Sequence, residues 1–235
     1  MSGLDLLAQV QINTGRKSSC VVDNGFCPDW IAQNFSRYIG PFFQHLLLVL
    51  LSVGIGFVIA TVLALLAHRR RGLVGPVGGF TEALFTIPSP AAFLLLLPFT
   101  GFGRTTAVIA LTAYTLNSLF RTFTTSLAGV PDDIKDAGRG MGLTENQLLT
   151  RVELPMALPG LFAGLRIATT TTVGLAALAF LAGAGGLGES IDSQITFQSN
   201  VAVAGGLAVL MAAVLDLLLL TAQRLATPWA RARAT

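Results

Sequence analysis

Long apolar segments are the feature that most constrains the fold of this chain. Of its 235 residues, 53% are hydrophobic and only 11% are charged. A helix needs roughly 20 apolar residues to cross a bilayer, and runs of about this length lie at 45–67, 75–99, 105–130, 161–182 and 201–222. The sequence therefore predicts an all-α integral membrane protein with about five transmembrane helices, and five spans place the two chain ends on opposite sides.

Basic residues beside the apolar segments predict the orientation in the membrane. Cytoplasmic loops carry an excess of Lys and Arg, and the basic cluster at 69–71 assigns one set of loops to the cytoplasm. That side then holds nine basic residues against four on the other, the nine being Arg69, Arg70, Arg71, Lys135, Arg139, Arg151, Arg224, Arg231 and Arg233. We expect the N-terminus outside and the C-terminus in the cytoplasm.

The same orientation divides the chain into three parts. Residues 1–41 form an extracytoplasmic N-terminal segment, in which we see no pattern of a cleaved signal. Residues 42–224 form the transmembrane domain, and 225–235 form a basic cytoplasmic tail. The loop at 131–160 is then cytoplasmic, and its part at 131–155 is called the polar segment below.

The composition argues against several other classes of protein. Two histidines, two cysteines and twelve acidic residues are spread along the chain, so no cluster predicts a metal site or a membrane-embedded enzyme. Basic residues border the apolar segments instead of forming one surface stripe, which argues against nucleic acid as a partner. The sequence contains no G-x-x-x-x-G-K-[ST] motif for ATP phosphates.

Both cysteines lie in the N-terminal segment, in the sequence CVVDNGFC. Cys20 and Cys27 flank a turn-forming Asp-Asn-Gly, and on the oxidising outer face they can close a small disulfide loop. The alternative is a pair of free thiols. A bridge would stabilise the local structure by about 2–3 kcal/mol.

The polar segment has the pattern of two short helices. Pro131 can start the first, with acids in its first turn where the helix dipole favours them. Thr144 and Gln147 form a capping box that starts the second helix at Glu145. We expect this helix to end at Leu154-Pro155 and to gather apolar side chains on one face: Leu148, Leu149 and Val152. The alternative is a simple amphipathic connector at the membrane surface.

Four charged residues fall within the apolar spans, and all four lie toward their cytoplasmic ends. Two acids and two bases at similar depth indicate pairing, as intramembrane charges generally pair; they are Glu82, Arg121, Arg166 and Asp216. For Arg166, snorkelling to the interface is the alternative, because this residue lies about one turn from the end of its span.

Polar residues and a helix break within the spans are candidates for a transport pathway. Backbone groups freed at membrane depth are tolerated where they face protein or water. The candidates are Thr86, Pro88, Ser89, Asn117, Thr170 and Thr171. The alternatives are a packing kink at Pro88 and threonines that bond their own helix. Both tryptophans lie outside the spans, so the sequence predicts no aromatic site for a quaternary ammonium group.

The spacing within the polar segment resembles a known signature. Asp136-Ala137-Gly138, three residues, Gly142, nine residues, Val152, one residue and Leu154-Pro155 is similar to the motif E-A-A-x3-G-x9-I-x-L-P. This motif belongs to the membrane subunits of bacterial ATP-binding cassette (ABC) importers. The stretches FTIPSPAAFLLLLPFTGFGRTTAVIALTAY and LAGAGGLGESI further resemble the osmoprotectant branch, over roughly residues 42–224. The chain departs from that branch in its N-terminal segment and at Phe85, where the branch usually has Gln.

The resemblance implies a type I permease fold and a mechanism. The polar segment would form a coupling helix in a groove of a cytoplasmic ATPase dimer, which would bind ATP and Mg²⁺ while this chain binds no cofactor. The residues implied in coupling are Asp136, Ala137, Gly138, Gly142, Leu148, Leu149, Val152, Leu154 and Pro155. A second permease, identical or paralogous, would complete the pathway in the bilayer, and an extracytoplasmic binding protein would deliver the solute.

The solute implied by the resemblance is glycine betaine, choline, carnitine or a similar compound, imported by alternating access. Two alternatives remain. One is an ABC importer permease for another small solute, such as an amino acid. The other is a channel or secondary transporter that works without an ATPase, although the two halves of the chain show no internal repeat.

Overall fold

The computed structural model describes residues 19–231, and every regular element in this part of the chain is helical. At the N-terminal end lie α1 (Ser19–Val22), α2 (Pro28–Asn34) and the 3₁₀ turn η2 (Phe35–Tyr38). The long helices are α3 (Ile39–Arg69), α6 (Arg104–Ala128), α9 (Leu154–Ala176) and α11 (Gln198–Ala226). Residues 1–18 and 232–235, which include Arg233 of the predicted tail, lie outside the described part.

Shorter elements connect these helices. After α3 come η3 (Arg71–Leu73), α4 (Val74–Thr86) and α5 (Ser89–Thr100). Between α6 and α9 lie α7 (Asp132–Gly140), α8 (Glu145–Leu148) and the π-helical turn η4 (Leu149–Glu153). Then come η5 (Ala179–Ala182) and α10 (Leu187–Ser193) before α11, and α12 (Pro228–Arg231) after it.

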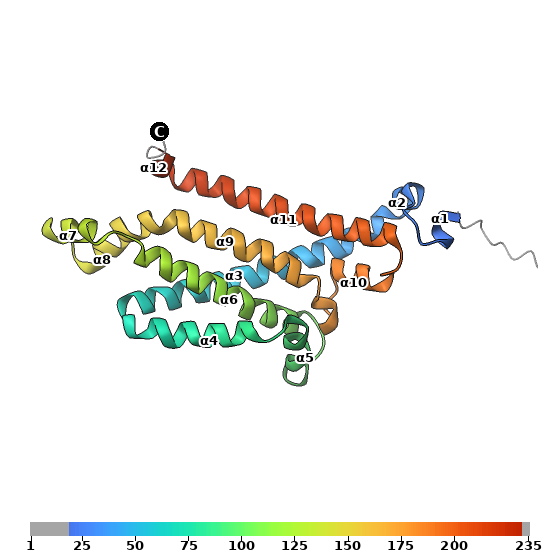
Figure 1. Cartoon of the computed structure of the whole chain (residues 1–235), viewed down its shortest axis with the longest axis horizontal. Helices are drawn as coiled ribbons and strands as arrows, with labels where there is room; N and C mark the ends of the chain where they lie inside the picture. The colour runs from blue at the N-terminus through green and yellow to red at the C-terminus, as the bar shows by residue number, and fades with distance from the viewer. Residues whose placement is uncertain (1–18, 232–235) are drawn as a thin grey trace, which may run out of the picture.

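The long helices form an elongated bundle (Figure 1). One end carries α7 and α8, the opposite end carries α1 and α2, and α12 lies toward the α7 end. The main core joins α3, α5, α6, α9 and α11 through Leu48, Phe93, Leu111, Val173 and Met211. A second core cluster, around Phe120 and Phe123, lies nearer the α7 end. The polar segment and the N-terminal segment are therefore at opposite ends of one bundle.

Small residues allow α6 and α9 to approach closely. A Cβ atom added at Gly164 of α9 would lie 2.6 Å from Cγ2 of Thr122 on α6, closer than real atoms pack. Such small-residue contacts are typical of membrane helices, whose association depends on close packing because lipid tails are as apolar as the helices. This contact fixes the α6–α9 interface that carries part of the candidate site.

The helices match the five predicted apolar segments in order. Three uninterrupted helical stretches are long and apolar enough to cross a membrane, Pro28–Arg69, Glu145–Ala176 and Gln198–Ala226, and α4 with α5 makes a fourth if the bent pair counts as one span. The remaining helix, α6, is 25 residues long but more polar. It lies against α3, α4 and α9, and several of its polar side chains are buried there, among them Thr106, Thr115 and Asn117. The count of five spans stays a prediction.

The second span is strongly bent. Helices α4 and α5 meet at 97° around Ile87 and Pro88, where the sequence predicted a break. Proline lacks the N–H group that would continue α4, and Ile87 before it adopts an extended conformation. Figure 1 shows α5 turned away from the bundle axis.

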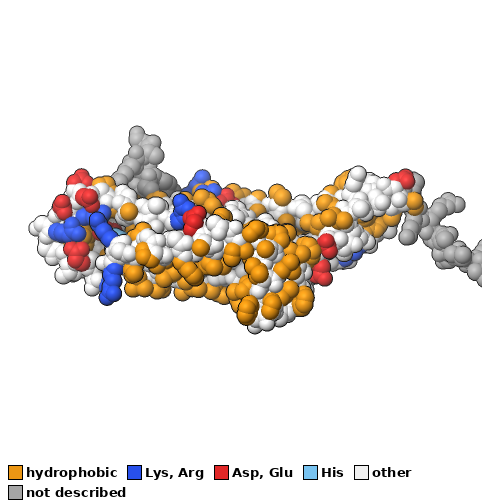
Figure 2. Space-filling model, turned by 60° about the horizontal axis from the view of Figure 1, so that its bottom comes forward, with side chains coloured by type: hydrophobic (Ala, Val, Ile, Leu, Met, Phe, Trp, Pro, Cys, Tyr) orange, Lys and Arg blue, Asp and Glu red, His pale blue; other side chains and the backbone are white. Residues whose placement is uncertain are grey.

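Charged side chains gather at the end that carries α7 and α8, whereas hydrophobic side chains dominate the middle of the molecule (Figure 2). Helix α11 exposes several large apolar side chains, among them Val209, Leu210 and Leu218. An apolar middle with a charged end is the surface expected of a bundle held in a bilayer.

Candidate functional site

The polar segment folds as two helices joined by a tight turn. Helix α7 starts directly after Pro131, and Gly142 in the turn has φ = +83°, a conformation that favours glycine. The predicted capping box is confirmed, because the Gln147 N–H donates to Thr144 Oγ1 at 3.4 Å and the Thr144 N–H donates to Gln147 Oε1 at 2.9 Å. These two bonds fix the start of α8 at Glu145.

The predicted end of this helix at Leu154-Pro155 is wrong. The chain stays helical from Glu145 through the π turn into α9, which ends at Ala176. The π turn lies directly before Pro155, and such turns are places where a helix changes its hydrogen-bond ladder. The fourth long helix therefore begins within the polar segment instead of at residue 161, and α8 is continuous with it through the π turn.

The predicted apolar face of α8 is only partly available to a partner, because Leu148 and Leu149 are buried within this chain. A Cβ atom at Gly138 would lie 2.7 Å from Leu148 Cδ1, so α7 and α8 pack closely there. Leu149 joins a cluster with Leu127 and Ala157. These leucines hold the segment onto α6 and α9, a role that periodicity alone does not distinguish from docking. Three further motif residues, Val152, Leu154 and Pro155, are half-buried.

The outer surface of the polar segment consists of other residues. Asp136, Ala137 and Gly142 of the motif are exposed. Met141, which the sequence analysis did not select, has 75% of its surface exposed at the tip between α7 and α8. A large apolar side chain at such a tip is the signal that identifies it, since an exposed methionine suits an adaptable protein contact.

Ion pairs brace the polar segment. Arg139 bonds Asp136 at 3.0 Å and Glu145 at 3.0 Å, so it spans the turn between the two helices. Lys135, which is buried, donates to Asp132 Oδ1 at 3.1 Å. This hydrogen bond and the positive charge of Lys135 hold the pKa of the Asp132 carboxyl below its ordinary value.

The end of α3 is tied to the polar segment as well. His68 Nε2 lies 2.5 Å from the buried Glu153 carboxylate, and Arg69 donates to Asn146 Oδ1 at 2.9 Å. The sequence alone identifies 69–71 only as a basic flank of the first span. These two contacts connect the first long helix to the segment that continues into α9.

The four charged residues within the spans form two pairs. Arg121 Nη1 lies 2.6 Å from Glu82 Oε2, joining α6 to α4. Arg166 makes two hydrogen bonds of 2.7 Å to Asp216, joining α9 to α11. Arg166 is therefore paired, and snorkelling is not needed to explain its position.

Of the six predicted pathway residues, only Thr171 lines a cavity between α4, α6 and α9. Pro88 and Ser89 lie at the bend between α4 and α5. The hydroxyls of Thr86 and Thr170 donate to carbonyls of their own helices. Asn117 is buried, and its Oδ1 atom has no hydrogen-bond partner in the described structure.

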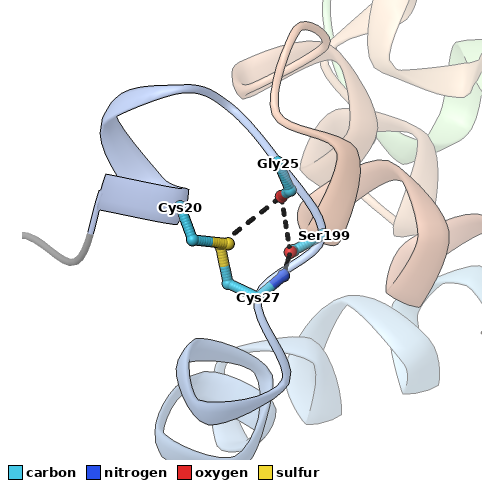
Figure 3. Close-up of a disulfide and its surroundings, with 4 residues drawn as sticks. All are labelled: Cys20, Gly25, Cys27 and Ser199. Atoms are coloured by element: carbon cyan, nitrogen blue, oxygen red, sulfur yellow. Dashed lines mark hydrogen bonds between the residues drawn. A yellow bond between two sulfur atoms is a disulfide. The ribbon is translucent and has the colours of Figure 1, made fainter.

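The two cysteines of the N-terminal segment form a disulfide (Figure 3). The loop that they close lies on the start of α11, where the Cys27 N–H donates to Ser199 Oγ at 2.6 Å and Ser199 Oγ donates to the Gly25 carbonyl at 3.0 Å. Tyr38 adds a bond to Asn200 Oδ1 at 2.7 Å. The segment is thus attached to the end of the bundle opposite the polar segment.

Within residues 19–231, no group of three His, Cys, Asp or Glu side chains could hold a metal ion. The candidate site is a charged helical segment braced by ion pairs at one end of a membrane bundle, and a small cavity lies between α4, α6 and α9. This arrangement suits a membrane subunit of a transport system. It defines the class of membrane-embedded transport proteins.

Comparison with known proteins gives the family. Residues 52–232 match the family described as the inner membrane component of binding-protein-dependent transport systems. The osmoprotectant import permease protein OsmW of Salmonella typhimurium is 41% identical over 79% of this chain and 90% of its own. The glycine betaine/carnitine/choline transport system permease protein OpuCB of Bacillus subtilis is 32% identical over 79% of this chain and 86% of its own.

Solved structures show the same fold. The inward-facing MetNI methionine ABC transporter matches with a TM-score of 0.68 and 25% identity, over 80% of this chain and 94% of the solved chain. An amino acid ABC transporter matches with a TM-score of 0.70 and 16% identity, over 83% of this chain and 96% of the solved chain. The chain belongs to the family of inner membrane permease components of binding-protein-dependent transport systems, and it has the fold of ABC importer permeases.

Proposed function

We propose that this chain is one membrane-spanning half of an ATP-driven importer for a small osmoprotectant solute, such as glycine betaine, choline or carnitine. The observation that carries this proposal is the 41% identity to an osmoprotectant import permease over 90% of that relative's length. The relatives named for glycine betaine, carnitine and choline support the same class of solute.

The polar segment transmits the movement of the ATPase to the membrane helices. A separate cytoplasmic ATPase dimer binds ATP and Mg²⁺ and contacts the exposed surface around Ala137, Met141 and Gly142. Because α8 continues through the π turn into α9, a displacement of the segment is passed directly to a long helix. The contacts of His68 and Arg69 pass the same displacement to α3. Two permease chains, identical or paralogous, then alternate between outward-open and inward-open states.

An extracytoplasmic solute-binding protein delivers the solute at the opposite end, as the family description implies. A second candidate solute is an amino acid such as methionine. It is favoured by the 25% identity to the methionine transporter over 80% of the chain. The higher identity to an osmoprotectant permease favours a quaternary ammonium compound over an amino acid as the solute.

The test is uptake into proteoliposomes that contain the permease, its ATPase and its binding protein. We expect ATP-dependent uptake of labelled glycine betaine or choline and little uptake of methionine. Uptake that needs no ATP would favour a channel or secondary transporter. ATP-driven uptake of methionine alone would assign the chain to amino acid import.

A further inference from the structure

A cavity of about 180 Å³ lies between α4, α6 and α9. It is smaller than the roughly 300 Å³ or more that drug-sized ligands occupy, so it suits a single small headgroup. Its lining carries no charged side chain. The lining side chains that could recognise a ligand are two aromatic rings and four hydroxyls: Phe85, Tyr114, Thr115, Ser118, Thr171 and Thr172.

The two aromatic rings are held together as walls of this cavity. The Phe85 and Tyr114 ring centroids lie 5.7 Å apart with the ring planes at 66°. The Tyr114 hydroxyl donates to the Ile87 carbonyl at the bend between α4 and α5, which fixes its ring.

Two of the hydroxyls are free to bind a ligand. In α9 the hydroxyls of Thr169, Thr170 and Thr172 each donate to a backbone carbonyl of the same helix. The Thr171 hydroxyl between them makes no hydrogen bond within residues 19–231, and neither does that of Ser118 on α6. Both line the cavity, so each can donate to an oxygen atom of a bound solute.

The face that carries the cavity is not a lipid-facing surface. Glu82 lies three residues before Phe85 on α4, and Arg121 lies three residues after Ser118 on α6, so each shares a helix face with a cavity residue. The side chains of this ion pair are 49% and 63% exposed. Ionised groups are costly in lipid and generally face water or protein at membrane depth. The cavity therefore opens toward a water-filled pathway or a second subunit.

We propose that this cavity is a solute subsite within the permease for a small quaternary ammonium compound that carries an oxygen at its other end. The proposal rests on the proposed function and specifies where that solute is recognised. The rings of Phe85 and Tyr114 attract the ammonium group through cation–π contacts, and the hydroxyls of Ser118 and Thr171 donate to the carboxylate or hydroxyl of the solute. The sequence predicted no aromatic site for a quaternary ammonium group, and the proposal departs from that prediction.

The cavity forms only one side of the proposed solute site. Phe85 keeps 43% of its surface exposed, so this chain alone does not close the cavity. A second permease facing α4, α6 and α9 would cover the solute from the other side. Recognition in the permease would then add to the selection made by the binding protein.

The test compares choline with its neutral isostere 3,3-dimethyl-1-butanol, which has the same shape but no charge. Binding to the full permease–ATPase complex, without the binding protein, is measured by equilibrium dialysis for the wild type, Phe85→Leu and Phe85→Tyr. We expect the wild type to prefer choline, and Phe85→Leu to weaken choline binding by about 3- to 30-fold, the range of one cation–π contact, with little change for the isostere. Phe85→Tyr should restore the preference.

A matched control is Phe57→Leu, because Phe57 pairs edge-to-face with Phe123 at 5.6 Å outside this cavity and should leave the choline preference unchanged. An equal loss of both compounds in Phe85→Leu would overturn the subsite, since it indicates a packing role only. So would a wild-type complex that transports choline but shows no saturable binding at millimolar concentration. If the wild type transports no quaternary ammonium compound, the proposed function itself fails, which uptake reveals separately.

Discussion

Arg166 and Asp216 form a two-point contact between α9 and α11, in which Nε donates to Oδ1 and Nη2 donates to Oδ2, both at 2.7 Å. The parallel geometry matches the planar guanidinium to the carboxylate. Their side chains are 28% and 29% exposed, so the pair is largely shielded. Because an unpaired charge at this depth is costly, the pair fixes how α11 sits against the helix that leaves the polar segment.

We expect Asp216→Asn to lower the melting temperature of the purified permease by several degrees, because it leaves the Arg166 guanidinium without its counter-charge. The double variant Arg166→Leu/Asp216→Leu should be milder than either single change, as replacing a whole ion pair by apolar side chains often is. Thermal unfolding followed by tryptophan fluorescence measures both. Additive losses in the double variant would contradict the pairing.

Glu82→Gln is the matched comparison on the other pair. The ion pair of Glu82 and Arg121 is half-exposed, and exposed ion pairs contribute little to stability. We expect almost no change in melting temperature but a change in transport rate, because this pair lies on the face that carries the cavity. A large thermal loss in Glu82→Gln would instead assign the pair to the structural core.

The sequence indicated that the four intramembrane charges pair, but it could not assign the partners. Similar depth makes both possible pairings of two acids with two bases equally acceptable, and only the contacts between helices decide between them. The same holds for Phe85 and Tyr114, which lie 29 residues apart and meet because α4 lies against α6. Local patterns such as the capping box at Thr144 were predictable, since all their partners lie within one turn.

The disulfide should order the N-terminal segment. Closing a loop across seven residues of separation is worth about 2–3 kcal/mol through the entropy of the open chain. We expect Cys20→Ser/Cys27→Ser to expose the backbone amides of residues 24–31 to hydrogen exchange while the main bundle stays protected. Mass spectrometry of the non-reduced wild type should find the two cysteine peptides linked.

Ser199→Ala provides the control, because it removes the hydroxyl that bonds both the Cys27 N–H and the Gly25 carbonyl but keeps the disulfide. It should loosen the contact with α11 while the loop stays closed. If the serine double variant protects these amides as well as the wild type does, the disulfide contributes nothing to the order of this segment.

The pair of Asp132 and Lys135 predicts a pH dependence for α7. The folded-state pKa of Asp132 is lowered by its hydrogen bond from Lys135, so the folded state favours the ionised carboxylate. The pair therefore stabilises α7 fully above the ordinary carboxyl pKa of 3.8, and this stabilisation is lost as the pH falls through the lower folded-state value. Hydrogen exchange of α7 amides between neutral and acidic pH measures it.

Asp132→Asn should remove this pH dependence and loosen α7 already at neutral pH, because the buried Lys135 loses its carboxylate. The neighbouring Asp133 makes no ion pair in the described part of the chain, so Asp133→Asn should keep the wild-type profile. Identical profiles for the two variants would show that the Lys135 contact does not stabilise the helix.

Leu148 and Leu149 mark where sequence reasoning about the polar segment was incomplete. A heptad-like apolar face can be buried against a partner or within the same chain, and the periodicity is the same in both cases. Burial within the same chain depends here on two other residues. Gly138 allows Leu148 to pack against α7, and Leu127 at the end of α6 clusters with Leu149. Neither contact is encoded within the helix itself.

Substitutions in the polar segment should distinguish residues that couple the permease to the ATPase from residues that stabilise its fold. Met141 is exposed at the tip and makes no contribution to the core. Met141→Asp should therefore leave the permease folded and abundant but weaken co-purification of the ATPase and reduce ATP-driven uptake at least several-fold.

Leu149→Glu should instead act through stability, because it places a charge among Leu127 and Ala157. It should cost at least the roughly 2–5 kcal/mol that loss of a buried leucine costs. Its loss of transport should therefore follow a loss of folded protein. Thr150→Ala is the matched control, because this exposed hydroxyl only bonds the Asn146 carbonyl of its own helix, and it should transport normally. Abundance by immunoblot, ATPase co-purification and uptake in vesicles are measured for all three. Normal uptake in Met141→Asp with the ATPase still bound would remove the tip from the coupling surface and leave the polar segment as a connector between α6 and α9.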